Sequence, residues 1–419
     1  MRSDISGFYR LTPGERLKKV QEFSNLTDEE ASLLETGHAL DLSQANRMIE
    51  NVIGLFQMPL GIATNFLING KDYLVPMVIE EPSVVAAASH AAKMAREKGG
   101  FTATSTDPVM IGQIQITDVI DPERAMERVL SDKGRILTKA NEQDPLLVSL
   151  GGGAKDLKAR VIETRVGRMV IVELLVDCRD VAGMNAVDTM VEAVAPVVED
   201  VTGGRVCLRI ISNLATRRLA RATCVIAKET LGGEEIVDGI IKAQAFAESD
   251  IYRCTTHNKG IMNGVIAVVQ ATGNDHRAIE AGAHAYACRD GRYEPLTIWE
   301  KNPDGDLVGT IELPMALGVV GGVTKSNPAF RIALKILGVR TSKELAEVVA
   351  SVGLAQNLAA LRALVAEGIQ RGHMKLHARN IAISAGATGD LVELVAGKMV
   401  EEGKIREDRA KELVRELSR

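Results

Sequence analysis

Apolar residues in the first hundred positions recur mostly at helical spacing, around one short continuous run. In DLSQANRMIENVIG (41–54) they fall three or four positions apart, behind polar residues suited to cap a helix. DYLVPMVIEEP (72–82) has a continuous apolar centre, which predicts a buried strand. SVVAAASHAAKMAREKGG (83–100) predicts a long helix ended by glycines. Its small side chains let another backbone approach closely, so we expect it to be a central, packed helix.

From residue 107 the pattern alternates between strands and helices. The predicted elements are a strand at 109–120, a helix at 121–144, strands at 157–166 and 168–177, a helix at 183–204 and a strand at 205–212. This order, βαββαβ, is that of the ferredoxin-like split unit. It predicts a small domain over 107–213, inserted into a larger and mainly helical domain made of 1–106 and 214–367.

The last fifty residues read as short helices that follow Gly368 and Gly372. A small unit over 368–419, tethered by glycines, is either a mobile lid or a plain helical cap. The predicted fold class is therefore α+β, with a large domain around a central helix, an inserted ferredoxin-like domain and a small helical C-terminal flap.

The composition argues against several classes of protein. A net charge of -5 and 3% aromatic residues argue against binding nucleic acid through its phosphates or by base stacking. No run of 18 apolar residues and no apolar leader occurs, so we expect a cytoplasmic chain without membrane contact. The five cysteines are scattered and form no CxxC pair, which predicts neither disulfides nor a thiolate zinc site.

Three segments carry groups that could do chemistry. Glu80 and Glu81 lie side by side between the predicted strand and helix, where one could act as a general acid or both could be solvated helix caps. Lys259 in HNKGIMNGV is predicted in a polar turn before an apolar run, suited to a developing oxyanion, although most lysines are surface residues. Asp275 is predicted between a strand, VVQA, and a helix, which fits either a functional group or a helix N-cap.

His373 and His377 are four apart in RGHMKLHARN and share one face of a predicted helix. Zinc would need a third ligand and a nearby base, so a proton donor or a structural histidine is favoured over a metal site. The glycine-rich turns at 150–156 and 317–326 match neither a P-loop nor GxGxxG. A dinucleotide, if bound, would be bound without a Rossmann fold.

Six segments in combination resemble the short, class II form of 3-hydroxy-3-methylglutaryl-CoA (HMG-CoA) reductase. They are ENVIG (50–54), PMVIEEPSVVAAAS (76–89), HNKGIMNG (257–264), ATGND (271–275), GLAQN (353–357) and GHMKLHARN (372–380). The resemblance covers essentially the whole chain in the same order. It implies two successive hydride transfers to a thioester, which give mevalonate and free CoA.

The resemblance also implies roles for four residues. Lys259 corresponds to the lysine that stabilises the oxyanion, Glu81 to the acid that protonates the carbonyl oxygen, and Asp275 to the aspartate that orders this network. His373 corresponds to the histidine that protonates the departing CoA thiolate, with His377 as its structural neighbour. The C-terminal unit corresponds to a mobile flap that closes over the substrate.

Further site residues follow from the same resemblance. The expected contacts to the hydroxymethylglutaryl group are Ser83, Arg253, Asn263 and Asn357. Those expected to bind the dinucleotide are Asp144, Asp180, Gly183, Asn185 and Asn213. RDVAGMN (179–185) stands where DAMGxN is usual, with Ala182 displacing the methionine, and this departure leaves the detailed contact open.

Asp144 occupies a position where an acidic residue goes with NAD(H), because a carboxylate can bond the ribose 2'-hydroxyl and repels a 2'-phosphate. We therefore expect NAD(H) to be preferred, with NADP(H) as a second cofactor and no metal. The resemblance further implies a homodimer, or an assembly of dimers, with active sites across the interface. The alternatives are a CoA-thioester enzyme of another type, such as an acyl-CoA lyase, and an inactive reductase fold with a regulatory or scaffold role.

Overall fold

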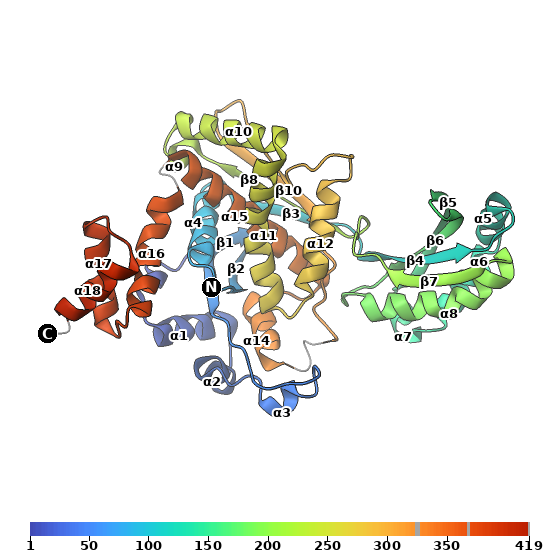
Figure 1. Ribbon diagram of the computed structural model, residues 1–419, viewed down its shortest axis with the longest axis horizontal. Helices are drawn as coiled ribbons and strands as arrows, with labels where there is room; N and C mark the ends of the chain where they lie inside the picture. Colours follow the sequence, from blue (N-terminus) through green and yellow to red (C-terminus); the bar gives the residue numbers. More distant parts are fainter. Residues whose placement is uncertain (323–326, 367–368, 418–419) are drawn as a thin grey trace.

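The computed structural model describes residues 1–322, 327–366 and 369–417, and the side chains of 369–376 lie outside that description. A central body carries a small sheet with its own helices on one side and three C-terminal helices on the other (Figure 1). The α+β class predicted from the sequence is confirmed.

The central body is built on a six-stranded sheet in the order β2-β1-β3-β8-β10-β9. Its strands are β1 (Leu60–Ile68), β2 (Lys71–Val78), β3 (Phe101–Ser105), β8 (Leu219–Ile226), β9 (Thr297–Lys301) and β10 (Leu307–Pro314). All neighbouring pairs are antiparallel except β1 with β3. The sheet makes this region less helical than the sequence predicted, since of these strands only β2 had been anticipated.

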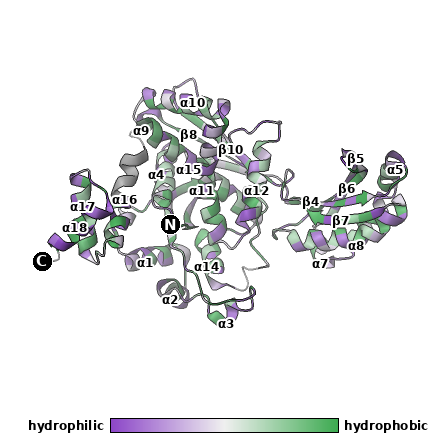
Figure 2. Ribbon diagram, viewed as in Figure 1, coloured by the Kyte–Doolittle hydropathy of each residue, from purple (hydrophilic) through white to green (hydrophobic). Residues whose placement is uncertain are grey.

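Three helices pack against one another and against this sheet: α4 (Val84–Arg96), α11 (Ile251–Ala271) and α15 (Ser342–Ala366). The alanine-rich face of α4 is fully buried, as expected of a central helix. Helix α15 has the length and apolarity of a membrane span, but 67% of its most apolar window is buried, which is typical of a core helix. Hydrophobic residues gather along these helices and the strands (Figure 2).

Two local predictions were wrong. The predicted helix over 41–54 is only one turn, α3 (Leu42–Ala45), and the residues after it form no helix or strand as far as β1. VVQA, predicted as a strand before Asp275, is the last turn of α11. A helix buried on nearly all sides loses its periodic pattern and resembles a buried strand over a few residues.

The small sheet has four antiparallel strands in the order β5-β6-β4-β7. They are β4 (Val109–Thr117), β5 (Gly153–Thr164), β6 (Gly167–Asp177) and β7 (Arg205–Ile211). The associated helices are α5 (Pro122–Ser131), α6 (Lys133–Asn141), α7 (Pro145–Ser149) and α8 (Met184–Thr202). The helix predicted over 121–144 is thus two helices, and the strand order agrees with the predicted βαββαβ unit.

The remaining helices cover the central body or form the C-terminal unit. They are η1 (Phe8–Arg10), α1 (Pro13–Ser24), α2 (Asp28–Thr36), α9 (Lys228–Leu231), α10 (Glu234–Ser249), α12 (His276–Ala287), α14 (Pro328–Leu337), α16 (Ile369–Ser384), α17 (Asp390–Glu401) and α18 (Glu407–Leu417). Helices α16 to α18 share a small apolar core of their own, which includes Ala382, Met399 and Leu413. Separate cores make this unit suited to move independently of the central body.

A buried polar network joins α11, α15 and β9. His257 Nε2 lies 2.7 Å from Thr297 Oγ1 and 3.2 Å from Asn357 Nδ2, and the ring is almost fully buried. Asn357 Oδ1 accepts hydrogen bonds from Thr297 Oγ1 at 3.0 Å and from Trp299 Nε1 at 2.7 Å. Burial, with a smaller contribution from nearby Arg253, lowers the pKa of His257 to about 3.

This low pKa predicts a pH-dependent stability. Between about pH 6.5 and pH 3 the unfolded chain binds a proton at His257 that the folded chain does not, so stability falls as pH falls, by up to about 1.4 kcal/mol per pH unit from this residue. His257→Gln should therefore show a shallower loss in urea unfolding across this range. His38→Gln, at an exposed histidine, is the control and should keep the wild-type slope. Equal slopes for both variants would contradict the assignment.

Candidate active site

A polar contact on the surface of the central body joins the β2–α4 turn to α11. Lys259 Nζ donates to Glu81 Oε2 at 2.9 Å, and Asn263 Nδ2 lies 3.4 Å from both carboxylate oxygens. Lys259 and Asn263 are four residues apart and therefore share one face of α11. A lysine, a carboxylic acid and an amide are thus brought together from positions almost 180 residues apart in the chain. The family resemblance had grouped Lys259 with Glu81 and had given Asn263 as a substrate contact.

The setting of these groups differs from the sequence-based expectation in two respects. Lys259 lies inside helix α11 and not in a turn, so a rigid backbone fixes the start of its side chain. The contact is also open, since the side chains of Glu81 and Lys259 remain 38% and 61% exposed. This chain, in the arrangement described, does not bury the contact, so its burial would require a different arrangement or another molecule.

Ser83, predicted to contact the substrate, lies two residues from Glu81 at the start of α4. Its backbone is in the left-handed region (φ 76°), which is uncommon for a residue with a side chain and is found preferentially at functional sites. Its Oγ is buried without a hydrogen-bond partner among the described residues. A buried, unpaired hydroxyl is costly and is suited to receive a polar ligand group.

Asp275, predicted to belong to the same network, lies apart from Glu81 and Lys259, at the start of α12. It caps α12 by accepting from the backbone N–H groups of Arg277 and Ala278, and its carboxylate pairs with the Arg277 side chain at 3.0 Å. Burial raises its pKa, but the Arg277 guanidinium and these N–H groups outweigh burial and hold the pKa below its usual value. The carboxylate is therefore an ionised acceptor near neutral pH.

Helix α11 separates Asp275 from Lys259. The 12 residues from Lys259 to Ala271 span about 18 Å of helix axis, and Asp275 follows beyond the end of that helix. A lysine side chain cannot cover this separation. The structure thus joins Glu81, Lys259 and Asn263 but leaves Asp275 apart from them within one chain.

The other two predicted substrate contacts differ in how free their side chains are to bind a ligand. The Arg253 guanidinium is half-buried near the start of α11, and burial lowers its pKa. Asn357 is only 2% exposed, and its amide is already engaged by Thr297, Trp299 and His257. Its neighbour Gln356, not singled out from the sequence, has a buried Oε1 without a partner among the described residues and packs on α11 at Gly264. Its place beside Asn357 in GLAQN was the only available signal.

His373 lies on α16, which agrees with the predicted helix, but its side chain is among those outside the described residues. His377 is one turn further along α16, where it is exposed beside buried Ala378. The structure therefore establishes the helical spacing of the pair and leaves the role of His373 as a prediction.

The predicted dinucleotide turn lies between β6 and α8. Gly183 is the N-cap of α8 with φ 106°, and a Cβ there would lie 2.6 Å from Cys178 Sγ, so the turn requires glycine. Asn185 is in the first turn of α8, whose N-terminus has no side-chain cap. Uncapped backbone N–H groups behind a glycine turn fit the phosphates of a dinucleotide. Asp180 is partly engaged elsewhere, since its Oδ1 accepts from Ser342 N at 2.7 Å.

Asp144 and Asn213 flank this turn in the sequence of the small unit. Asp144 caps α7 through a 2.8 Å hydrogen bond from Leu147 N to its Oδ1. The end of α7 approaches the turn, since a Cβ at Gly152 would meet both Leu147 and the Asp177 carbonyl. Asn213 follows β7, and its carbonyl accepts from Ala215 N at 3.0 Å.

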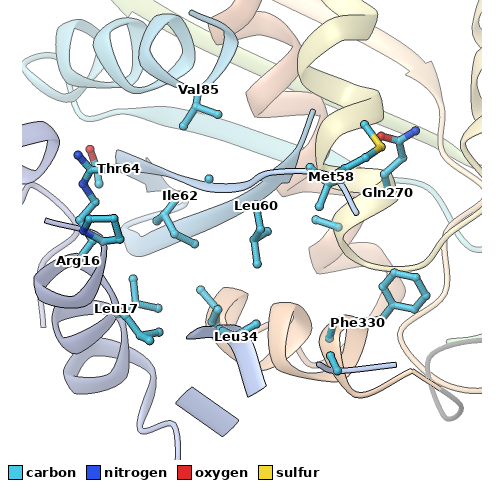
Figure 3. Close-up of a pocket in the computed structure, with 18 of the residues that line it drawn as sticks. Arg16, Leu17, Leu34, Met58, Leu60, Ile62, Thr64, Val85, Gln270 and Phe330 are labelled. Atoms are coloured by element: carbon cyan, nitrogen blue, oxygen red, sulfur yellow. The ribbon is translucent and has the colours of Figure 1, made fainter. Parts of the chain in front are cut away.

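A cavity of about 2280 Å³ lies between the N-terminal helices and the central body. Leu17 and Leu34 of α1 and α2 face Ile62 of β1 across it, with Val85 of α4 above and Phe330 of α14 to one side (Figure 3). Ser83, Asp275 and residues 54–58 also line it. It is larger than the few hundred to about 1,000 Å³ of most small-molecule sites.

Comparison with known proteins gives a consistent result. The family model described as hydroxymethylglutaryl-coenzyme A reductase matches residues 12–378. The chain is 63% identical over 418 residues to the 3-hydroxy-3-methylglutaryl-coenzyme A reductase of Archaeoglobus fulgidus, covering 100% of this chain and 95% of that protein. It is 37% identical over 342 residues to a probable enzyme of the same name from Borreliella burgdorferi, covering 80% and 77% of the two chains.

Solved structures agree. A 3-hydroxy-3-methylglutaryl-coenzyme A reductase from Streptococcus pneumoniae superposes with a TM-score of 0.84 at 40% identity over 98% of this chain and 99% of that one. The class II enzyme from the same organism, bound to NADPH in open conformations, has a TM-score of 0.83 at 40% identity and covers 98% and 100%. With its whole length matched by sequence and by structure, the chain belongs to the hydroxymethylglutaryl-coenzyme A reductase family.

Proposed function

We propose that Lys259, Glu81, Asp275 and His373 carry out the four-electron reduction of HMG-CoA to mevalonate and CoA. The observation that supports this most directly is the 2.9 Å contact between Lys259 Nζ and Glu81 Oε2. An ammonium group and a carboxyl group at this distance can both face one carbonyl oxygen. The acyl-CoA lyase alternative is not favoured, because the whole chain matches reductases.

Each group has a separate task. Bound nicotinamide supplies hydride at each of the two reductions. The Lys259 ammonium stabilises the negative charge that develops on the thioester oxygen, and Glu81 delivers a proton to that oxygen. As the hemithioacetal opens to the aldehyde, its C–S bond breaks, the hydroxyl proton returns to the Glu81 carboxylate, and His373 protonates the departing CoA thiolate, a task for a group that titrates near neutral pH. Ser83, Arg253, Asn263 and Asn357 contact the hydroxymethylglutaryl group, with Arg253 on its free carboxylate.

The proposal includes a homodimer in which Asp275 of the partner subunit completes the site. In one chain Asp275 lies beyond the C-terminal end of α11, too far away for Lys259 to reach it. The Lys259–Glu81 contact is open to solvent, which fits a site that a second subunit covers.

The segment before β1 also supports an interface. Ile53 and Phe56 are 101% and 92% exposed in a stretch without helix or strand, which is unusual for large apolar side chains. The same stretch lines the cavity beside Asp275. Apolar residues so placed would be buried against a second copy of the chain.

The division into domains, the compartment and the cofactor choice belong to the same proposal. Residues 107–213 form the dinucleotide-binding domain, 1–106 with 214–367 the substrate domain, and 368–419 the flap. The enzyme works in the cytoplasm, which agrees with five free cysteines, two of them exposed. NAD(H) is preferred through Asp144, and no step assigns a role to a metal ion.

Replacing the proposed oxyanion partner tests the chemistry. Lys259→Ala should lower kcat by at least about 10²-fold, because a preorganised donor to the developing oxyanion is lost. The KM for HMG-CoA should change far less, since this interaction strengthens mainly in the transition state. The measurement is NADH oxidation with HMG-CoA under saturating conditions. Lys242→Ala, at an exposed lysine of α10, is the control and should behave as wild type. A comparable kcat for both variants would exclude the proposed role.

Mixing two inactive variants tests the shared site. Lys259→Ala and Asp275→Asn remove groups that the proposal assigns to opposite subunits of one site. After random exchange of subunits, half of the dimers are mixed and each carries one intact site of two, so about a quarter of wild-type activity should return. Activity that stays at the level of the separate variants would place both residues in the same subunit's site.

The cofactor choice can be tested without disturbing the local fold. Asp144→Asn keeps a side-chain oxygen to cap α7 and removes only the charge. The ratio of kcat/KM for NADH to that for NADPH should fall by about tenfold, because repulsion of the 2'-phosphate is relieved. Asp121→Asn, which alters the equivalent cap of α5, should leave the ratio unchanged. An unchanged ratio in Asp144→Asn would assign the choice to another residue.

A further inference from the structure

The segment 316–320, directly after β10, lies between two parts of the proposed site. On one side Asn274, the residue before Asp275, accepts a hydrogen bond from Gly318 N at 2.8 Å and donates to Gly318 O at 3.1 Å. On the other side Val319 N donates to the Asp180 carbonyl at 2.9 Å. The segment therefore contacts both the loop that carries Asp275 and the turn proposed to hold the dinucleotide.

The Arg218 side chain connects the same turn to this segment through hydrogen bonds. Its guanidinium donates to the carbonyls of Val181 at 3.1 Å and Ala182 at 3.0 Å, and also to the carbonyl of Leu317. Arg218 is only 4% exposed, and it forms no salt bridge among the described residues, although the charges of Asp177 and Asp180 offset part of the cost of its burial. A cation buried on carbonyl groups costs free energy of desolvation, so stability alone gives little reason for it.

Gly318 allows the two backbones to meet. A Cβ at this position would lie 2.6 Å from Ala182 N and 3.0 Å from Val181 C, with no flexible side chain able to move aside. The requirement for glycine comes from this close approach and not from backbone conformation, because the φ of Gly318 is outside the left-handed region.

We propose that Arg218, Asn274 and Gly318 are positioning residues that fix the dinucleotide turn at a set distance from Asp275. None of the three needs to touch substrate or cofactor. Arg218 holds the turn, Asn274 holds the aspartate loop, and both hold the backbone of 317–318. The inference rests on the proposed assignment of the turn 180–185 to the dinucleotide.

Equilibrium binding tests the proposal on the assembled enzyme without turnover. The titrations follow NADH fluorescence and, separately, the heat of HMG-CoA binding, for Asn274→Ala, Arg218→Gln and Gly318→Ala. Each variant loses hydrogen bonds to the connecting segment or gains a backbone clash at the turn, so the Kd for NADH should rise by about tenfold while the Kd for HMG-CoA stays within about twofold. Arg218→Lys, which keeps the charge and part of the donor set, should fall between Arg218→Gln and wild type. Gly134→Ala, at an exposed helical glycine with open space around it, is the matched control.

The outcomes distinguish the positioning role from the assignment of the turn 180–185 to the dinucleotide, on which that role rests. Asn185→Ala, in the proposed turn itself, is titrated in parallel. If Asn185→Ala weakens NADH binding and the three variants do not, the positioning role is overturned and the turn assignment stands. If Asn185→Ala also binds NADH as wild type, both are overturned. Arg218→Gln removes a buried group and is the variant most prone to unfold; in that case Asn274→Ala, which loses two hydrogen bonds to Gly318 and two to Thr272, decides the question.

Discussion

The contact between Lys259 and Glu81 is the constraint around which the site is arranged. It joins the middle of α11 to the turn after β2, two elements that the chain brings together only through the packing of α4, α11 and α15 on the large sheet. An exposed ion pair of this kind contributes about 1 kcal/mol or less to stability. Its position is therefore maintained by the hydrophobic core beneath it, and the charged groups are free to serve chemistry. The buried network of His257, Thr297 and Asn357 lies under the same helix and adds to its fixed placement.

Helix α11 is also the reason why the proposed mechanism includes a second chain. It is 21 residues long and carries the lysine near its middle, while Asp275 lies beyond its C-terminal end. A helix is too stiff to bring these groups together within one chain, so the proposed network would be completed by a second copy of the chain. The exposed apolar residues before β1 and the large cavity beside Asp275 are the surfaces on which such a copy would be expected to pack.

Much of this arrangement could be predicted from the sequence, and the exceptions have physical causes. The βαββαβ order was predictable because its strands are separated by helices such as α5 and α8, in which the buried residues recur at helical spacing. Lys259 and VVQA were assigned to a turn and a strand because α11 is buried along most of its length, and its polar residues HNK interrupt the apolar pattern at the site itself. Prediction of this helix from local sequence therefore failed at the positions where polar residues of the site interrupt the apolar pattern. The grouping of Glu81 with Lys259 came from a family resemblance, since no local pattern carries information on contacts 178 residues apart.

Because Asp275 and Lys259 are separated in one chain, each subunit would contribute a different set of groups to the proposed site. The residue before Asp275, Asn274, is hydrogen-bonded to Gly318, and the next residue, Val319, is hydrogen-bonded to the turn before α8, so the aspartate and the proposed dinucleotide turn are connected within the same chain. Lys259, Glu81 and Ser83 belong to a different part, around the middle of α11 and the start of α4. If two chains share a site, one subunit then supplies the oxyanion partner and the substrate pocket, and the other supplies the aspartate and the cofactor together. Hydride transfer depends on sub-ångström placement of the hydride donor and acceptor. With this division of residues, a single subunit interface sets the position of the donor relative to the acceptor. A buried cation at Arg218 is consistent with that demand, because a guanidinium bound to three carbonyls restricts the turn in a way that an apolar side chain of equal volume would not.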